Sequence, residues 1–215
     1  EIYLSMNDTI AKLHNVDFDK VNLADYGKHE NYMDRQIHRW TKQYKDSETQ
    51  MIPEINELIE WLPKNIPSDQ ETSIVHGDFR LDNMIFDPVT HEVKAILDWE
   101  LSTLGNPIAD FTYHMMSWRL PAGAKGLGMM GSDLKSLNIP SESEYAELYY
   151  KKTGREKIDN WDFYMAYNIF RLAGIAQGIV GRVRDGTASS SEAKNYEAFV
   201  PILGKLGWSI VEGIK

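Results

Sequence analysis

Apolar residues recur at helical spacing along most of the chain, which predicts a largely helical protein. Residues 2–13 and 33–44 each carry one apolar stripe of the kind that faces a core. A third helix is predicted to begin near Pro53, because proline is favoured in a first helical turn, and to end before Pro63. Residues 17–28 are polar and aperiodic, and they predict a loop between the first two helices.

The second half of the chain predicts four further helices. An apolar run covers residues 108–118, and a capping box over residues 141–144 predicts a helix that ends at Gly154. Residues 160–184 predict a long buried helix, and residues 190–213 predict the last one.

Short apolar runs in the middle of the chain interrupt this pattern and predict strands. They cover residues 74–75, 84–86 and 93–97. Residues 87–91 contain Asp, Pro, Thr and His, which predict a hairpin turn between the second and third strands. Residues 101–107 are expected to form a loop. The predicted fold class is therefore α+β, mainly helical, with a small β-hairpin.

Polar residues suited to phosphoryl transfer follow these strands. His76 and Asp78 come directly after the first strand, Asn83 lies on the loop that follows, and Asp98 comes fifteen positions after Asn83. In a phosphotransferase one carboxylate accepts the hydroxyl proton, while an Asn and a second carboxylate hold Mg²⁺ on ATP. The pattern predicts Asp78 as the base, Asn83 and Asp98 as metal ligands, and His76 as a buried organiser of the loop.

These motifs resemble those of a known family. The segments H-G-D-F-R-L-D-N from His76 and I-L-D-W-E from Ile96 resemble the aminoglycoside phosphotransferase and choline kinase family, which shares the protein-kinase-like fold. L-D-W-E-L-S-T-L-G-N-P-I-A-D from Leu97, I-P-S-E-S-E-Y from Ile139 and F-R-L-A-G-I-A-Q-G from Phe170 are similar to one branch of it. That branch comprises the phosphotransferase domains associated with acyl-CoA dehydrogenase family members 10 and 11.

The resemblance covers residues 1–215 and implies a single domain, the C-terminal lobe of the kinase-like fold. Nothing before His76 resembles the N-terminal lobe that grips the nucleotide, so that lobe is expected to be absent from this chain. The resemblance also implies that Asp110 hydrogen-bonds the backbone of the catalytic loop. The alternative for Asp110 is an ordinary first-turn carboxylate favoured by the helix dipole.

The resemblance places the acceptor substrate between the catalytic loop and the C-terminal helices. The residues expected to face it are Arg80, Glu100, Trp118, Arg119, Arg171 and Gln177. An arginine two residues after Asp78 favours a neutral or anionic acceptor over a cation, although a salt bridge within the loop is an equal alternative. The branch implies hydroxyacyl-CoA thioesters as acceptors and an acyl-CoA dehydrogenase domain or neighbour as a partner.

The composition of the chain argues against several kinds of partner and binding site. Lys and Arg total 23 against 32 Asp and Glu, and the net charge of −9 argues against nucleic acid and anionic membrane surfaces. Cysteine is absent, which excludes disulfides and thiolate zinc sites and is compatible with a reducing cytosol. No run of about 18 apolar residues occurs, so no membrane span is predicted. A cytoplasmic protein is expected.

Several alternatives compete with an active kinase of this branch. One is a catalytically silent, pseudokinase-like binding module, and another is an aminoglycoside- or choline-type kinase with a cationic substrate. A metallophosphoesterase is disfavoured because it needs several His ligands for two metals. Residues 126–131 match G-x-G-x-x-G formally, but no strand precedes them, so a mobile loop over the acceptor site is expected there.

Overall fold

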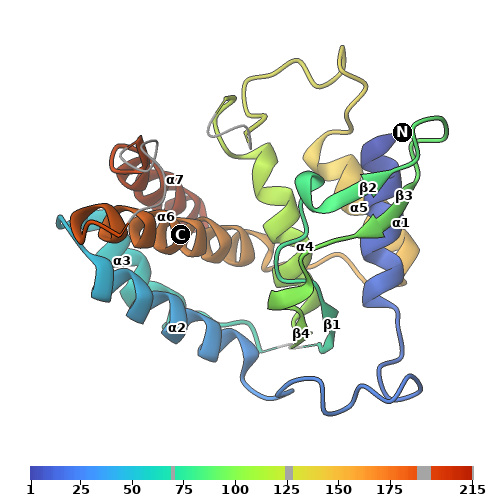
Figure 1. Cartoon of the computed structure of the whole chain (residues 1–215), viewed down its shortest axis with the longest axis horizontal. Helices are drawn as coiled ribbons and strands as arrows, with labels where there is room; N and C mark the ends of the chain where they lie inside the picture. Colours follow the sequence, from blue (N-terminus) through green and yellow to red (C-terminus); the bar gives the residue numbers. More distant parts are fainter. Residues whose placement is uncertain (69–70, 124–127, 188–194, 215) are drawn as a thin grey trace. The chain divides into compact units, whose positions relative to one another are not determined.

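The computed structural model describes residues 1–68, 71–123, 128–187 and 195–214 (Figure 1). The chain divides into two compact units. Unit 1 comprises Glu1–Glu30 and Gln70–Asp159, and unit 2 comprises Asn31–Asp69 and Asn160–Lys215. Helices dominate both units, as the sequence predicts, and the strands that the structure describes all lie in unit 1.

Unit 1 contains two small antiparallel sheets. Strand β1 (Ser73–Val75) pairs with β4 (Thr103–Gly105), and β2 (Met84–Phe86) pairs with β3 (Val93–Ile96). The register places Val75 opposite Thr103, so the chain leaves β1 beside the segment that enters β4. Both pairs therefore bring the polar segments that follow the strands into one region of unit 1.

The pair β2–β3 is the predicted hairpin, whereas β4 differs from the expectation of a loop over residues 101–107. The Asp87 carboxylate closes the hairpin turn by accepting hydrogen bonds of 2.9 Å from the backbone N–H groups of Val89 and Thr90. Strand β4 has three residues, too few to show an alternating pattern, and its partner strand is distant in the sequence. Only the long-range pairing reveals it.

Three helices support these sheets in unit 1. Helix α1 (Ile2–His14) packs against α5 (Glu142–Thr153) and β1, and α4 (Pro107–Met115) also packs against β1. Helix α4 continues as a 3₁₀ turn, η4 (Met116–Trp118). The predicted capping box and glycine stop of α5 are both present, with Gly154 at φ +71°. The core between these helices is largely aromatic.

Unit 2 is a helical bundle. The long helix α6 (Trp161–Arg184) packs against both α2 (Tyr32–Ser47) and α7 (Phe199–Ile214), and α3 (Pro53–Trp61) packs against α7. The predicted helices over 33–44 and 160–184 are confirmed.

The last helix begins later than the pattern predicts. Helix α7 starts at Phe199, and residues 195–198 form turns, while residues 190–194 lie outside the described part of the chain. Close packing then fixes its position, because an added Cβ at Gly207 would lie 2.9 Å from Leu58 Cδ1.

Residues 124–127, which contain the start of the predicted glycine-rich loop, are outside the described residues, and the loop over the acceptor site stays a prediction. None of the helices in the described ranges is long and apolar enough to cross a membrane.

Candidate active site

The segment that leaves β1 turns sharply at Gly77. This residue has φ +84°, a backbone conformation that residues with a side chain rarely adopt. An added Cβ would lie 2.6 Å from the backbone oxygen of Leu101. Glycine is therefore required here by both backbone conformation and space. The turn directs the next residue, Asp78, away from the strand and into the loop that carries Asn83.

Three side chains surround the Asp78 carboxylate. The Tyr113 hydroxyl donates a hydrogen bond of 2.8 Å to Oδ1, and Nδ2 of Asn83 donates one of 2.9 Å to Oδ2. Arg80 Nε lies 3.7 Å from Oδ1. The Asp78 side chain is still 25% exposed. The carboxylate is thus oriented by fixed donors and remains reachable from solvent.

His76 is buried and uses both ring nitrogens within the protein. Its Nε2 lies 2.8 Å from the backbone oxygen of Leu97, and its Nδ1 lies 3.2 Å from the backbone nitrogen of Asp78. A neutral ring with the proton on Nε2 satisfies both contacts, because that nitrogen can donate to the carbonyl while Nδ1 accepts from the N–H. The ring consequently joins the loop of residues 76–83, predicted to be catalytic and called the catalytic loop below, to the end of β3.

Asp110 on α4 binds the backbone of the same loop. Its carboxylate accepts hydrogen bonds of 2.8 Å from the N–H groups of His76 and Gly77. Asn106 caps this helix by accepting bonds of 2.9 Å from the N–H groups of Ile108 and Ala109, which holds α4 in place. Asp110 thus makes the loop contacts that the resemblance implies, and its first-turn position in α4 fits the helix dipole as well.

A buried chain extends from Asp110 to α5. His14 Nε2 lies 3.1 Å from Asp110 Oδ2, and His14 Nδ1 lies 2.7 Å from the Tyr149 hydroxyl. Burial lowers the pKa of His14, which outweighs the raising effect of Asp110. Burial acts to raise the pKa of Asp110, but His14 and the two backbone donors hold it below its ordinary value. A neutral His14 therefore donates to an ionised Asp110 and accepts from Tyr149.

The predicted metal ligands lie on neighbouring segments. The backbone N–H of Leu97 donates to the backbone oxygen of Asn83 at 2.8 Å, which places Asp98 beside the loop. Asp98 has φ +59° and is exposed. Both hydrogen bonds recorded for the Asn83 side chain use Nδ2, so its Oδ1 remains available to a ligand. Within the described ranges, no three His, Asp or Glu side chains form a potential metal cluster.

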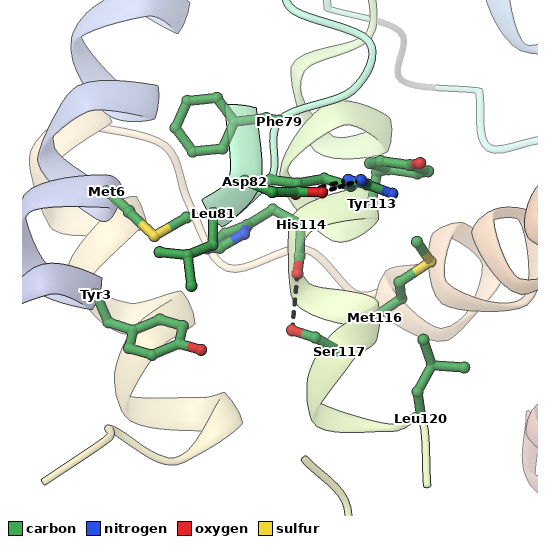
Figure 2. A pocket seen from close by; sticks show the side chains of 11 residues that line it. Tyr3, Met6, Phe79, Leu81, Asp82, Tyr113, His114, Met116, Ser117 and Leu120 are labelled. Atoms are coloured by element: carbon green, nitrogen blue, oxygen red, sulfur yellow. Dashed lines mark hydrogen bonds and ion pairs between the residues drawn. The ribbon is translucent and has the colours of Figure 1, made fainter. Parts of the chain in front are cut away.

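A cavity of about 270 Å³ opens next to the catalytic loop (Figure 2). Its lining residues come from α1, the loop after Asp78 and the segment from α4 to Leu120. They are Tyr3, Met6, Phe79, Arg80, Leu81, Asp82, Tyr113, His114, Met116, Ser117 and Leu120. All of them belong to unit 1.

Of the residues expected to face the acceptor in unit 1, only Arg80 is among those that line the described cavity. Arg80 is also paired within the loop, since its guanidinium contacts both carboxylate oxygens of Asp82. Glu100 is exposed on the turn after Asp98. Trp118 is buried and donates through Nε1 to the backbone oxygen of Pro140 at 2.9 Å.

The remaining candidates are engaged in structural contacts. Arg119 Nη2 lies 2.6 Å from a carboxylate oxygen of Glu142, the first residue of α5. Arg171 belongs to unit 2, where it is buried and its guanidinium lies 5.2 Å from the centroid of the Trp40 ring. Gln177, also in unit 2, donates a bond of 2.6 Å to the backbone oxygen of Ser47. The sequence identifies these polar residues as candidates for binding the acceptor, but it does not show that they form contacts within the fold.

Three site residues were not predicted from the sequence. Tyr113 and His114 lie among the apolar residues of α4, where their type is typical of a core. His14 ends the first helix in the segment L-H-N-V-D, which carries no catalytic signature alone. The position of Tyr113 three residues after Asp110 places both on one helix face, and this spacing is the one signal that could have connected it to the loop.

The sequence of this chain is similar to those of known proteins. The model of the phosphotransferase enzyme family matches residues 1–148. The chain is 44% identical over 208 residues to acyl-CoA dehydrogenase family member 10 of Mus musculus, covering 96% of the chain and 20% of that protein. It is 38% identical over 208 residues to acyl-CoA dehydrogenase family member 11 of Homo sapiens, covering 96% of the chain and 26% of that protein.

A solved structure shows the same fold. It is a Ralstonia eutropha protein assigned as an aminoglycoside phosphotransferase, with a TM-score of 0.95 and 50% sequence identity. The match covers 99% of this chain and 65% of that one, and the chain spans about a fifth to a quarter of the two dehydrogenase relatives. The predicted kinase-like fold and the resemblance to members 10 and 11 are confirmed. The chain therefore belongs to the phosphotransferase enzyme family.

Proposed function

We propose that this chain catalyses transfer of a phosphoryl group from Mg²⁺-bound ATP to a hydroxyl group of a small molecule. The observation that carries the proposal is the arrangement around Asp78. Its carboxylate is oriented by Tyr113 and Asn83 yet remains partly exposed. A general base needs this combination, because it must have a fixed direction and must still reach the proton that it accepts.

The residues present fit a magnesium ion. Mg²⁺ prefers oxygen ligands and commonly takes only one or two of them from the protein. The Oδ1 atom of Asn83 and the exposed carboxylate of Asp98 are such oxygens on adjacent segments. The bound ion would neutralise charge on the phosphates and orient them for transfer.

The chain's own residues account for proton transfer and for the shape of the site. The acceptor hydroxyl donates its proton to Asp78 while its oxygen attacks the γ-phosphorus of ATP, and the bond from that phosphorus to the bridging oxygen breaks to release ADP. Tyr113 and Asn83 hold the carboxylate, and Asp110 and His76 hold the backbone on either side of Gly77. These supporting contacts are buried, so the geometry does not have to be assembled when the substrate arrives.

The names of the relatives suggest where to look for the acceptor. Two relatives are named as acyl-CoA dehydrogenases and the related structure as an aminoglycoside phosphotransferase. We propose hydroxyacyl-CoA thioesters as the first class to test, with an acyl-CoA dehydrogenase domain or neighbour as partner, and aminoglycosides and choline as the alternatives.

The experiment uses the protein in its full natural length. It is incubated with ATP and Mg²⁺ and with each acceptor class, and phosphate transfer is followed by mass spectrometry beside Asp78→Ala. A phosphorylated product that Asp78→Ala fails to form supports the proposal and identifies the acceptor class. Equal activity of Asp78→Ala would refute the assignment of the base.

A further result would favour a different function. If the parent protein binds Mg-ATP but transfers phosphate to none of the acceptors, a silent binding module becomes the better description.

A further inference from the structure

The cavity beside the catalytic loop is lined mainly by apolar side chains. The apolar lining residues come from α1, the loop after Asp78 and the segment from η4 to Leu120, and they are Met6, Phe79, Leu81, Met116 and Leu120 (Figure 2). Met and Leu side chains are flexible and adapt their shape to an aliphatic ligand. Such a wall favours an apolar occupant over a polyol, because it leaves most hydroxyl groups without hydrogen-bond partners.

The charges on the wall are paired or absent. Arg80 and Asp82 contact one another, so their charges oppose each other at one end of the cavity. His114 also lines the cavity. Burial lowers its pKa to about 4, and its Nε2 lies 2.9 Å from the Tyr145 hydroxyl. His114 is thus neutral near pH 7. A multiply charged cation finds no surplus of negative charge in this wall.

Two residues connect the cavity directly to the proposed base. Tyr113 lines the cavity and donates its hydroxyl hydrogen to Asp78 Oδ1, and Arg80 lines it with Nε 3.7 Å from the same atom. Phe79, the next residue after Asp78, forms part of the wall. A molecule with its hydroxyl group at Asp78 therefore lies next to this cavity.

The size of the cavity sets what can enter. Its volume of about 270 Å³ is below the roughly 300–1,000 Å³ of pockets that enclose whole drug-sized ligands. It is suited to one segment of a substrate, and several linked sugar rings exceed it.

We infer that this cavity binds an unbranched alkyl segment of the acceptor and selects acceptors by the length of that segment. The inference rests on the proposed function for the position of the reacting hydroxyl. It goes further by assigning a specificity site to residues of α1, the catalytic loop and η4. Ser117, on the short turn η4, is the wall residue at which a larger side chain would fill the space.

The test measures binding directly, so it does not depend on turnover. Butanol, hexanol and octanol are titrated into the full-length protein by calorimetry. Each added methylene that enters the cavity should strengthen binding about fourfold. Ser117→Leu should fill the cavity and weaken octanol binding more than tenfold, whereas Ser117→Ala should keep the dependence on chain length.

Ser209→Leu is the matched control. Ser209 and Ser117 each donate their hydroxyl hydrogen to the backbone oxygen three residues earlier, but Ser209 is exposed on α7 in unit 2. Circular dichroism and urea unfolding establish that each variant is folded. The same substitution at Ser209 should leave alcohol binding unchanged.

The outcomes separate the two proposals. Affinity that does not depend on chain length, that survives Ser117→Leu, or that falls equally in Ser209→Leu overturns the cavity assignment. Chain-length-dependent binding together with no transfer in the acceptor panel supports the cavity and refutes the phosphotransferase function. Transfer without chain-length-dependent binding supports the phosphotransferase function and refutes the cavity assignment.

Discussion

The hydroxyl group of Tyr113 donates a hydrogen bond of 2.8 Å to Oδ1 of Asp78 and thereby joins helix α4 to the catalytic loop. Tyr113 is buried, so this donor has little freedom to move. Asp110, one helical turn earlier, binds the loop backbone through its carboxylate. Helix α4 consequently fixes both the backbone of the loop and the direction of the Asp78 side chain.

Tyr113→Phe should therefore reduce catalysis. A hydrogen bond to a charged group contributes about 1.5–3 kcal/mol, so we expect kcat to fall about ten- to hundredfold. Nucleotide KM should change little, because the Tyr113 hydroxyl donates to Asp78, which is the proposed base and is not a proposed metal ligand. Steady-state kinetics on the acceptor found in the panel measure both constants. Tyr26→Phe, at a tyrosine that is 41% exposed, is the control and should match the parent.

Asp98→Ala should abolish Mg²⁺-dependent nucleotide binding while leaving the fold intact. Asp98 is exposed, and its φ of +59° suits Asp better than Ala, so the substitution should cost about 1 kcal/mol of stability and leave the protein folded. Isothermal titration with ATP in the presence and absence of Mg²⁺ measures the effect. Asp25→Ala removes another exposed carboxylate of unit 1 and should bind as the parent does. Unchanged Mg²⁺ dependence in Asp98→Ala would exclude Asp98 as a ligand.

Gly77→Ala should destabilise the protein more than Gly154→Ala. Both glycines have positive φ, at +84° and +71°, and this conformation costs a non-glycine residue about 1–2 kcal/mol. Only at Gly77 would the new Cβ also contact Leu101, 2.6 Å from its backbone oxygen, whereas nothing lies within 4 Å at Gly154. Urea unfolding compares the two variants. Equal losses would show that the loop can move to accommodate the methyl group.

The buried imidazole of His114 should make stability depend on pH. Burial lowers its pKa from 6.5 to about 4, so between these values the unfolded chain binds a proton that the folded chain does not. Stability therefore falls as pH falls from 6.5 to about 4, by about 3 kcal/mol from this group. The lowered pKa of His14 acts in the same direction.

Urea unfolding of His114→Gln across this range measures the contribution. The variant should lose less stability than the parent as the pH falls. Tyr145→Phe removes the hydroxyl next to His114 but keeps the imidazole, so it should be less stable at every pH while retaining the parent's slope. Identical slopes for His114→Gln and the parent would contradict the prediction.

Most helices and the hairpin could be predicted from the sequence because their signals are local. The stripes of α1 and α2, the capping box of α5 and the apolar run of α6 repeat over several turns. Strand β4 and the start of α7 could not be predicted in this way. A three-residue strand is defined by its hydrogen bonds to a partner strand. The start of α7 depends on contacts that its own sequence pattern does not encode.

The predicted acceptor residues illustrate the same limit. Trp118, Arg119, Arg171 and Gln177 have the chemistry of binding residues, but each makes contacts with its own unit: a carbonyl, a carboxylate, an aromatic ring and a helix end. Residue type and position along a helix do not specify which of these uses applies. The neighbour in space decides, and that neighbour is usually distant in the sequence.

By itself the sequence predicted the chemistry of the candidate site, because Asp78, Asn83 and Asp98 lie in one narrow segment beside the predicted strands. Only the tertiary structure decided how Asp78 is held and what lies beside it. Tyr113 reaches Asp78 from α4, and His14 on α1 contacts Asp110, which binds the loop. The cavity arises where α1, the loop and η4 meet. Contacts between distant segments depend on packing, which no local pattern records.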